Sequence, residues 1–104
     1  MHRITVQYAP PASEAEEEFE RRYREEHVPL VHDLPGLVGF SLSWPQPLAG
    51  EKLVHLVAQL DFASAEDLGA ALRSEQMAAA GRHAASLGVP ATMFAGEVEV
   101  VAGG

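Results

Sequence analysis

The chain has 104 residues, no cysteine and a formal net charge of −8 at pH 7. The missing cysteines exclude a disulfide scaffold, a thiolate metal site and a cysteine nucleophile, and the negative charge argues against binding to nucleic acid or to an anionic membrane. The length favours one domain over residues 1–104. No apolar stretch approaches the roughly 20 residues that span a bilayer, and the N-terminus lacks the apolar core of a signal peptide, so we expect a cytoplasmic protein.

The first third of the chain predicts a strand followed by a helix. Residues 3–8 alternate between apolar and polar side chains, which is typical of a strand, and Pro10 should end it. Ser13 and Glu16 have the spacing of a capping box and predict the start of a helix. One face of this helix is charged, and the opposite stripe consists of Ala15, Phe19, Tyr23 and His27. Pro29 is expected to break or kink the helix.

The remaining chain predicts three further strands and a second helical region. Residues 37–44 alternate, and their larger side chains share one face: Val38, Phe40, Leu42 and Trp44. Residues 52–62 and 91–101 are the other two predicted strands, and Ser64 and Ser74 each look like the first residue of a helix. The order β-α-β-β-α-β predicts a ferredoxin-like α+β fold, with a four-stranded antiparallel sheet and helices on one of its faces.

The sheet face away from the helices points to a homodimer. The predicted strands place mixed, weakly charged residues there: Leu37, Gly39, Ser41, Leu53, His55 and Val57. A solvated sheet face usually carries more Lys, Glu and Thr. Pairing of this face with a second copy of the chain explains the missing charge, while an exposed, semi-polar face is the alternative.

One stretch of the sequence resembles a known family. The motif Phe19-x-x-x-Tyr23-x-x-x-His27-Val28-Pro29-Leu30, followed by Leu34-Pro35-Gly36, is similar to the signature region of the EthD family of dimeric α/β-barrel proteins. The resemblance implies a ferredoxin-like dimer and the broad class of oxidoreductases, since the family is associated with oxidative ether degradation. Proteins of the same fold group include cofactor-free monooxygenases, polyketide cyclases, lactone isomerases and haem-degrading enzymes, and some fungal EthD-like proteins are dehydratases. The fold alone therefore does not assign the reaction.

His27 is the candidate catalytic residue. It lies on the same helix stripe as Phe19 and Tyr23, so it should point toward the sheet or the rim of a cavity. An imidazole in that place can move a proton near neutral pH, as an enolisable or phenolic substrate requires. The alternative is a structural role, in which the ring bonds a backbone carbonyl at the kinked helix end.

Five aromatic residues are candidates for binding a small hydrophobic or aromatic ligand: Tyr8, Tyr23, Phe40, Trp44 and Phe94. They form either a pocket between helices and sheet or ordinary core. Among the other histidines, His55 is predicted at the dimer interface, His32 at the helix end and His83 in solvent.

The sequence predicts no cofactor. His27 and His32 are five residues apart, which is poor spacing for a shared metal on a helix, and nucleotide-binding loops are absent. We therefore expect no stoichiometric metal, flavin or nicotinamide, while haem held by one axial histidine stays open. Three functions remain: a cofactor-independent oxidoreductase or related isomerase or cyclase, an accessory protein that carries a ligand for a partner oxygenase, and a dimer with no small-molecule role.

Overall fold

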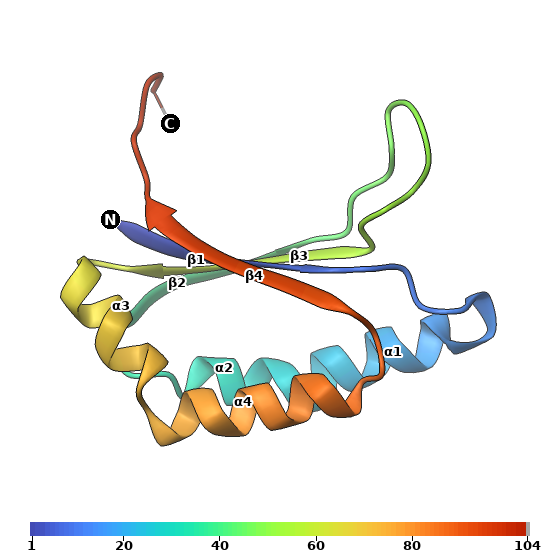
Figure 1. Ribbon diagram of the computed structural model, residues 1–104, viewed down its shortest axis with the longest axis horizontal. Coiled ribbons are helices and arrows are strands. Elements are labelled where there is room, and N and C mark those ends of the chain that lie inside the picture. The colour runs from blue at the N-terminus through green and yellow to red at the C-terminus, as the bar shows by residue number, and fades with distance from the viewer. Residues whose placement is uncertain (104) are drawn as a thin grey trace.

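A four-stranded antiparallel sheet lies over one layer of helices (Figure 1) in the computed structural model, which describes residues 1–103. The strands are β1 (His2–Tyr8), β2 (Leu37–Ser43), β3 (Leu56–Phe62) and β4 (Ala91–Glu97). Their order across the sheet is β2-β3-β1-β4, so the first and third strands are central and the other two form the edges. The predicted ferredoxin-like α+β fold is confirmed.

The helices all cover the same sheet face (Figure 1). The first helical segment consists of a 3₁₀ turn (Ser13–Ala15), α1 (Glu16–Arg22), a π-helical turn η2 (Tyr23–His27) and α2 (Val28–His32). The second consists of α3 (Ala65–Leu72) and α4 (Glu75–Ser86). The hydroxyls of Ser64 and Ser74 each accept a backbone N–H at 3.1 Å and cap these two helices, as their positions predicted.

Of the break or kink expected at Pro29, the structure contradicts the break. The chain stays helical through this point because the π turn absorbs the irregularity: the N–H of Val28 donates to the carbonyl of Tyr23, five residues back. Pro29 is in the first turn of α2, directly after the π turn, and because it lacks an N–H it cannot donate to a carbonyl of that turn. The capping box at Ser13 is also wrong, since that residue begins the 3₁₀ turn and α1 starts at Glu16 without a side-chain cap. Single-turn π bulges occur often at functional sites.

Alternate residues of β3 form the floor of the core. Leu56, Ala58, Leu60 and Phe62 are all buried against the helices. One part of the core gathers around Ile4, Val31 and Phe62, and the other around Tyr8, Phe19 and Tyr23. Burying each large side chain of this kind contributes roughly 1.5–3 kcal/mol, so the helical layer is held mainly by this strand and β1.

Three strand predictions need correction. The strand predicted for 52–62 begins only at Leu56, and the strand predicted for 91–101 ends at Glu97. A register shift between Leu37 and Gly39 makes Val38 a bulge, so its side chain is 64% exposed instead of facing the helices. Because of the same shift, Leu37 pairs with Phe62 and packs against the core, not on the open face.

The open sheet face is defined by three cross-strand rows of residues: Ser43-Val57-Gln7-Thr92, Ser41-Gln59-Thr5-Phe94 and Gly39-Asp61-Arg3-Gly96. Its main charges neutralise each other, because Arg3 Nε lies 2.7 Å from the carboxylate of Asp61. The segment between β2 and β3 and the chain after β4 both extend away from the sheet on this side (Figure 1). Among the described residues, no helix is long and apolar enough to cross a membrane.

Candidate active site

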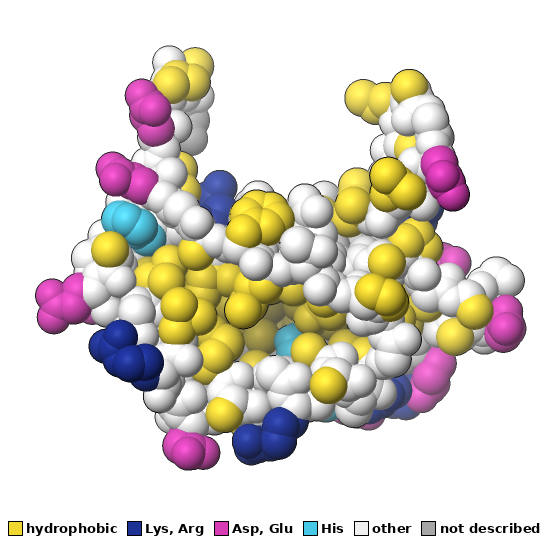
Figure 2. All heavy atoms as spheres, viewed as in Figure 1, with side chains coloured by type: hydrophobic (Ala, Val, Ile, Leu, Met, Phe, Trp, Pro, Cys, Tyr) yellow, Lys and Arg dark blue, Asp and Glu magenta, His cyan; other side chains and the backbone are white. Residues whose placement is uncertain are grey.

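A cavity of about 260 Å³ lies between the helix-facing side of the sheet and the helices. On the sheet side it is lined by β1, β3 and β4, and on the helix side by residues of η2, α2 and α4. Small residues on α4, namely Ala80, Gly81 and Ala84, leave the space that larger side chains would fill. Figure 2 shows an apolar hollow in the molecular surface between the sheet and the helices. The cavity is therefore suited to a small apolar molecule.

His27 is the buried polar residue of this cavity. It is the last residue of the π turn and is only 4% exposed. Its ring packs against Tyr23 at 4.8 Å between centroids, and its Nδ1 lies 2.9 Å from Nδ1 of His83 on α4. Nε2 makes no hydrogen bond with any residue in 1–103. It is the ring atom free to contact a molecule in the cavity.

His83 and Glu26 fix the protonation of the His27 ring. Nε2 of His83 lies 2.9 Å from Oε1 of Glu26, and hydrogen bonds from His83 and Arg22 hold the pKa of this carboxyl below its usual range. An ionised carboxylate only accepts, so Nε2 of His83 carries a proton, and in the tautomer with a single ring proton its Nδ1 accepts. Nδ1 of His27 must then donate to His83, which leaves a lone pair on Nε2 of His27. The chain Glu26–His83–His27 thus presents a base to the cavity.

Burial, and next the nearby His83, lower the pKa of His27 to about 4. A histidine whose pKa is lower in the folded protein than in the unfolded chain stabilises the fold above the unfolded value of about 6.5. We therefore expect the free energy of unfolding to fall as the pH drops from about 6.5 toward 4. Urea denaturation at pH 7 and pH 5 measures this, and His27→Asn should reduce the difference between the two. An equal pH dependence in wild type and variant would contradict the assignment.

Two tyrosines are among the residues that line the cavity. They are Tyr8 and Tyr23, and their rings meet edge to face at 5.5 Å. Burial raises the pKa of Tyr8 to about 12, and burial together with Tyr8 raises the pKa of Tyr23 further. Both phenols are therefore neutral at pH 7, and neither hydroxyl bonds to another group within residues 1–103. They can donate to an oxygen atom of a ligand.

The structure brings together only part of the predicted aromatic pocket. Tyr8 and Tyr23 line the cavity with His27, but Phe40 and Trp44 are partly buried and pack against the core outside it. Phe94 pairs with Thr5, so it lies on the open face of the sheet and is 50% exposed. The sequence did not indicate which sheet face Phe94 occupies. Residues on both faces of β4 are exposed, so this strand has no clear apolar side.

Two histidines differ from their sequence predictions. His55 is not on the open face: it is 4% exposed, and Nε2 lies 3.1 Å from Glu20 on α1. His83 is not simply solvated, since it joins His27 to Glu26. The sequence did not indicate these two contacts of His83, because His27 and Glu26 lie more than 50 residues away from it in the chain. One sequence signal was available: His83 lies three residues, about one helical turn, after Ala80, so both are on the same face of α4, which lines the cavity at Ala80.

The chain matches a known protein family over most of its length. Residues 12–87 match the EthD domain. The chain belongs to the EthD family. An uncharacterized 11.0 kDa protein of Rhodococcus erythropolis, from the thcB-thcC intergenic region, is 34% identical over 77 residues, which cover 73% of each chain.

Three solved structures share the fold of this EthD-family chain. An EthD family protein from Bacillus halodurans C-125 has a TM-score of 0.82 at 23% identity, covering 95% of this chain and 99% of its own. A variant of SnoaB, a cofactor-independent oxygenase from Streptomyces nogalater, has a TM-score of 0.65 at 15% identity, with 96% and 94% covered. A variant of MhuD with two manganese protoporphyrin IX bound per active site has a TM-score of 0.68 at 26% identity, with both chains covered completely.

Proposed function

We propose that this EthD-family protein is a cofactor-independent enzyme that transforms a small hydrophobic or aromatic molecule, with His27 as its acid/base. The class would be an oxidoreductase or a related isomerase or cyclase. The observation that carries the proposal is the His27 ring, which lines an apolar cavity, has its Nδ1 bonded through His83 to Glu26, and has no hydrogen bond at Nε2 within residues 1–103.

The cavity chemistry suits a substrate that loses a proton. An imidazolium surrounded by apolar side chains is costly, so His27 rests neutral and gains a proton only as negative charge develops on the substrate beside it. Nδ1–H of the charged ring would still donate to His83, and the Glu26 carboxylate would stabilise the positive charge. The hydroxyls of Tyr8 and Tyr23 would stabilise an enolate or phenolate oxygen. The resulting anion can be reprotonated elsewhere, close a ring or react with dioxygen.

The volume of the cavity limits the ligand. A dry engineered cavity of about 150 Å³ binds benzene, so 260 Å³ accommodates a molecule of about one or two rings. The cavity reaches β4, an edge strand whose residues are all exposed, and Met93 on its inner side is 57% exposed. A ligand would enter between β4 and α4.

We also propose that the protein acts as a homodimer through the open sheet face. Large apolar side chains are exposed on this side: Leu48, Leu53, Phe94, Val100 and Val101. Leu48 and Leu53 lie on the segment between β2 and β3, and Val100 and Val101 lie on the segment after β4. Both segments extend beyond the sheet (Figure 1). Stacking a second sheet on this face would cover Phe94 and Val57, and the two segments would flank the partner.

Filling the cavity tests the proposed binding site. A Cβ added at Gly81 would meet nothing within 4 Å, and Gly81 lines the cavity, so the leucine of Gly81→Leu is expected to extend into it. Removing a helical glycine stabilises by about 1 kcal/mol, so the melting temperature should rise while binding of naphthol is lost. Binding is followed by the methyl NMR signals of Met77 and Met93, which line the cavity.

Gly81→Ala is the matched control. It gives the same gain in helix propensity and adds only one methyl group, so it should retain naphthol binding. Equal binding by Gly81→Leu and the wild type would place the ligand elsewhere and remove support for the site.

The alternative is a carrier that holds the ligand for a partner oxygenase without reacting with it. A carrier needs the cavity but not the proton transfer. Two results together would favour the carrier over the enzyme. Gly81→Leu would lose ligand binding, and His27→Asn would leave any turnover of the ligand unchanged.

A further inference from the structure

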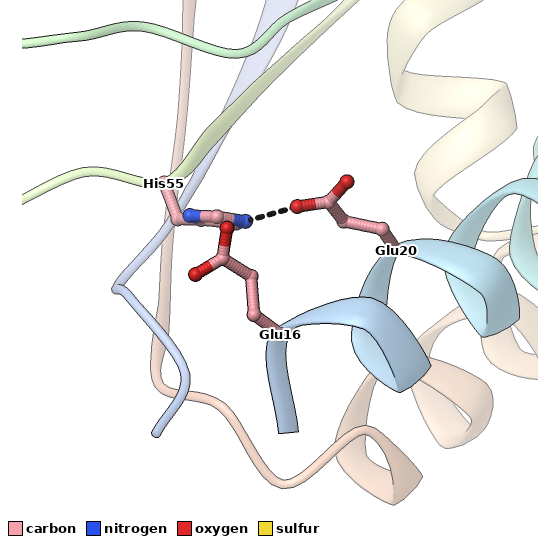
Figure 3. Close-up of side chains that lie close together, drawn as sticks. All are labelled: Glu16, Glu20 and His55. Atoms are coloured by element: carbon pink, nitrogen blue, oxygen red, sulfur yellow. Dashed lines mark hydrogen bonds and ion pairs between the residues drawn. The ribbon is translucent and has the colours of Figure 1, made fainter. Parts of the chain in front are cut away.

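We propose that Glu16, Glu20 and His55 bind a divalent transition-metal ion, with Zn²⁺ as the best match, at a site separate from the His27 cavity. One ligand atom from each of the three residues lies within 4.8 Å of the other two. Figure 3 shows both carboxylates directed from the helix toward one end of the His55 ring. None of the three residues lines the cavity.

The helix and the strand each position part of the cluster. Glu16 and Glu20 are four residues apart on α1, so their side chains lie one above the other on the same face. His55 directly precedes β3, and its backbone N–H donates to the carbonyl of Tyr8 at 2.8 Å. This bond anchors the residue to the end of β1 before its side chain reaches the helix.

The His55 ring is held in place independently of the carboxylates. It is 4% exposed, and it meets the rings of Phe19 and Trp44 edge to face at 5.8 and 5.7 Å. This packing keeps Nε2 pointing out of the core toward α1, at 3.1 Å from Oε2 of Glu20. A rigid imidazole nitrogen beside two carboxylates offers the nitrogen and oxygen ligands that first-row transition metals accept.

The local charge favours a cation. The only cationic side chain among the described residues that pairs with this cluster is Arg24, at 3.5 Å from Oε1 of Glu20. The guanidinium of Arg24 lies 4.5 Å from the centre of the Trp44 ring, and Glu16 has no ion pair within residues 1–103. Two adjacent carboxylates repel each other, and a dication between them would remove that repulsion.

The donor set selects the kind of metal. Ca²⁺ and Mg²⁺ prefer oxygen ligands alone, whereas imidazole with carboxylates suits Zn²⁺ and its neighbours in the first transition series. Three protein ligands would leave at least one position for water. The metal would tie α1 to the start of β3, so binding should stabilise the fold.

This site departs from the expectation that the protein binds no metal. That expectation considered histidines close in sequence, while His55 lies 35 residues from Glu20. Glu16 and Glu20 look like members of the charged helix face, and only the fold brings the histidine to them.

Titration calorimetry of the chelator-treated full chain with Zn²⁺ tests the site. The wild type should bind one Zn²⁺ per chain, and its melting temperature should rise with added Zn²⁺. Glu16→Gln and Glu20→Gln should each weaken binding about 10-fold or more and abolish the rise. Glutamine keeps the size of the side chain at both positions and can still bond to His55, so the variants should fold normally; His55→Gln provides a third test in which folding is checked separately.

Two control variants make the result specific. Glu17→Gln removes the same charge from the neighbouring position of α1 and should bind Zn²⁺ like the wild type. His83→Gln removes the histidine that contacts Glu26 and should also bind normally. Absence of saturable binding, an equal loss in Glu17→Gln, or loss in His83→Gln with binding intact in Glu16→Gln would each overturn the proposal.

Discussion

His27→Asn is expected to lower turnover by about 100-fold or more while the protein stays folded. A positioned general acid/base contributes about 10²–10⁴-fold to a rate, and asparagine has no group that takes up a proton at neutral pH. The rate is measured on whichever compound the wild type converts in a panel of phenols and enolisable aromatic ketones. His32→Asn is the matched control, because His32 is exposed and does not line the cavity.

His27→Ala separates the catalytic role from a structural one. If the ring serves only the fold, alanine should cost about 1–3 kcal/mol for a lost buried hydrogen bond, and asparagine should restore much of it with ligand binding intact. That pattern would move His27 from the site to the scaffold. In the proposed role both variants lose turnover, and they do so even where asparagine restores the stability that alanine loses with the bond to His83.

The partners of His27 provide a readout that needs no substrate. Nitrogen-15 NMR should show the His27 proton on Nδ1 and an unprotonated Nε2, since His83 accepts from Nδ1. His83→Gln and Glu26→Gln should change this tautomer or the pH at which the ring titrates. They should reduce turnover less than His27→Asn, because they act through the ring and do not touch the substrate.

Val57→Asp is expected to convert the proposed dimer into monomers. Val57 lies on β3, a central strand, in the row with Gln7 and Ser43 on the open face. Sheet stacking would bury one unpaired carboxylate from each subunit, which costs several kcal/mol. A cost of about 4 kcal/mol raises the dissociation constant about a thousandfold.

Sedimentation or light scattering measures this change at micromolar concentration. Val57→Thr keeps the shape of the side chain without a charge, so it should remain dimeric. In the monomer Val57 faces solvent in part, so the aspartate variant should keep its secondary structure. A wild-type protein that runs as a monomer would refute the dimer, whatever the variants do.

The fold was largely predictable from the sequence because its signals are local. Alternation of apolar residues indicated the strands, and Ser64 and Ser74 indicated the two later helix starts, which the structure confirms. The errors arose where one residue changes the register: the bulge at Val38 shifted Leu37 to the core, and the π turn kept Pro29 inside a helix. Neither feature has a sequence pattern of its own.

The candidate site was predictable only in part because its contacts are long-range. The stripe of Phe19, Tyr23 and His27 indicated which helix face turns inward, and Tyr8 followed from strand alternation. The partners of His27 and His55 come from segments that only the tertiary fold brings together. The open space of the cavity depends on the small residues of α4, and a sequence pattern does not distinguish small residues that pack closely from small residues that leave a gap.

A crystal structure of the protein soaked with naphthol decides whether the cavity is a substrate site. We expect the ligand in the cavity between β4 and α4, with its hydroxyl within hydrogen-bond distance of Nε2 of His27 and with Nδ1 still bonded to His83. A cavity closed by core side chains, with the His27 ring bonded to a backbone carbonyl and the ligand absent or bound elsewhere, would contradict this expectation.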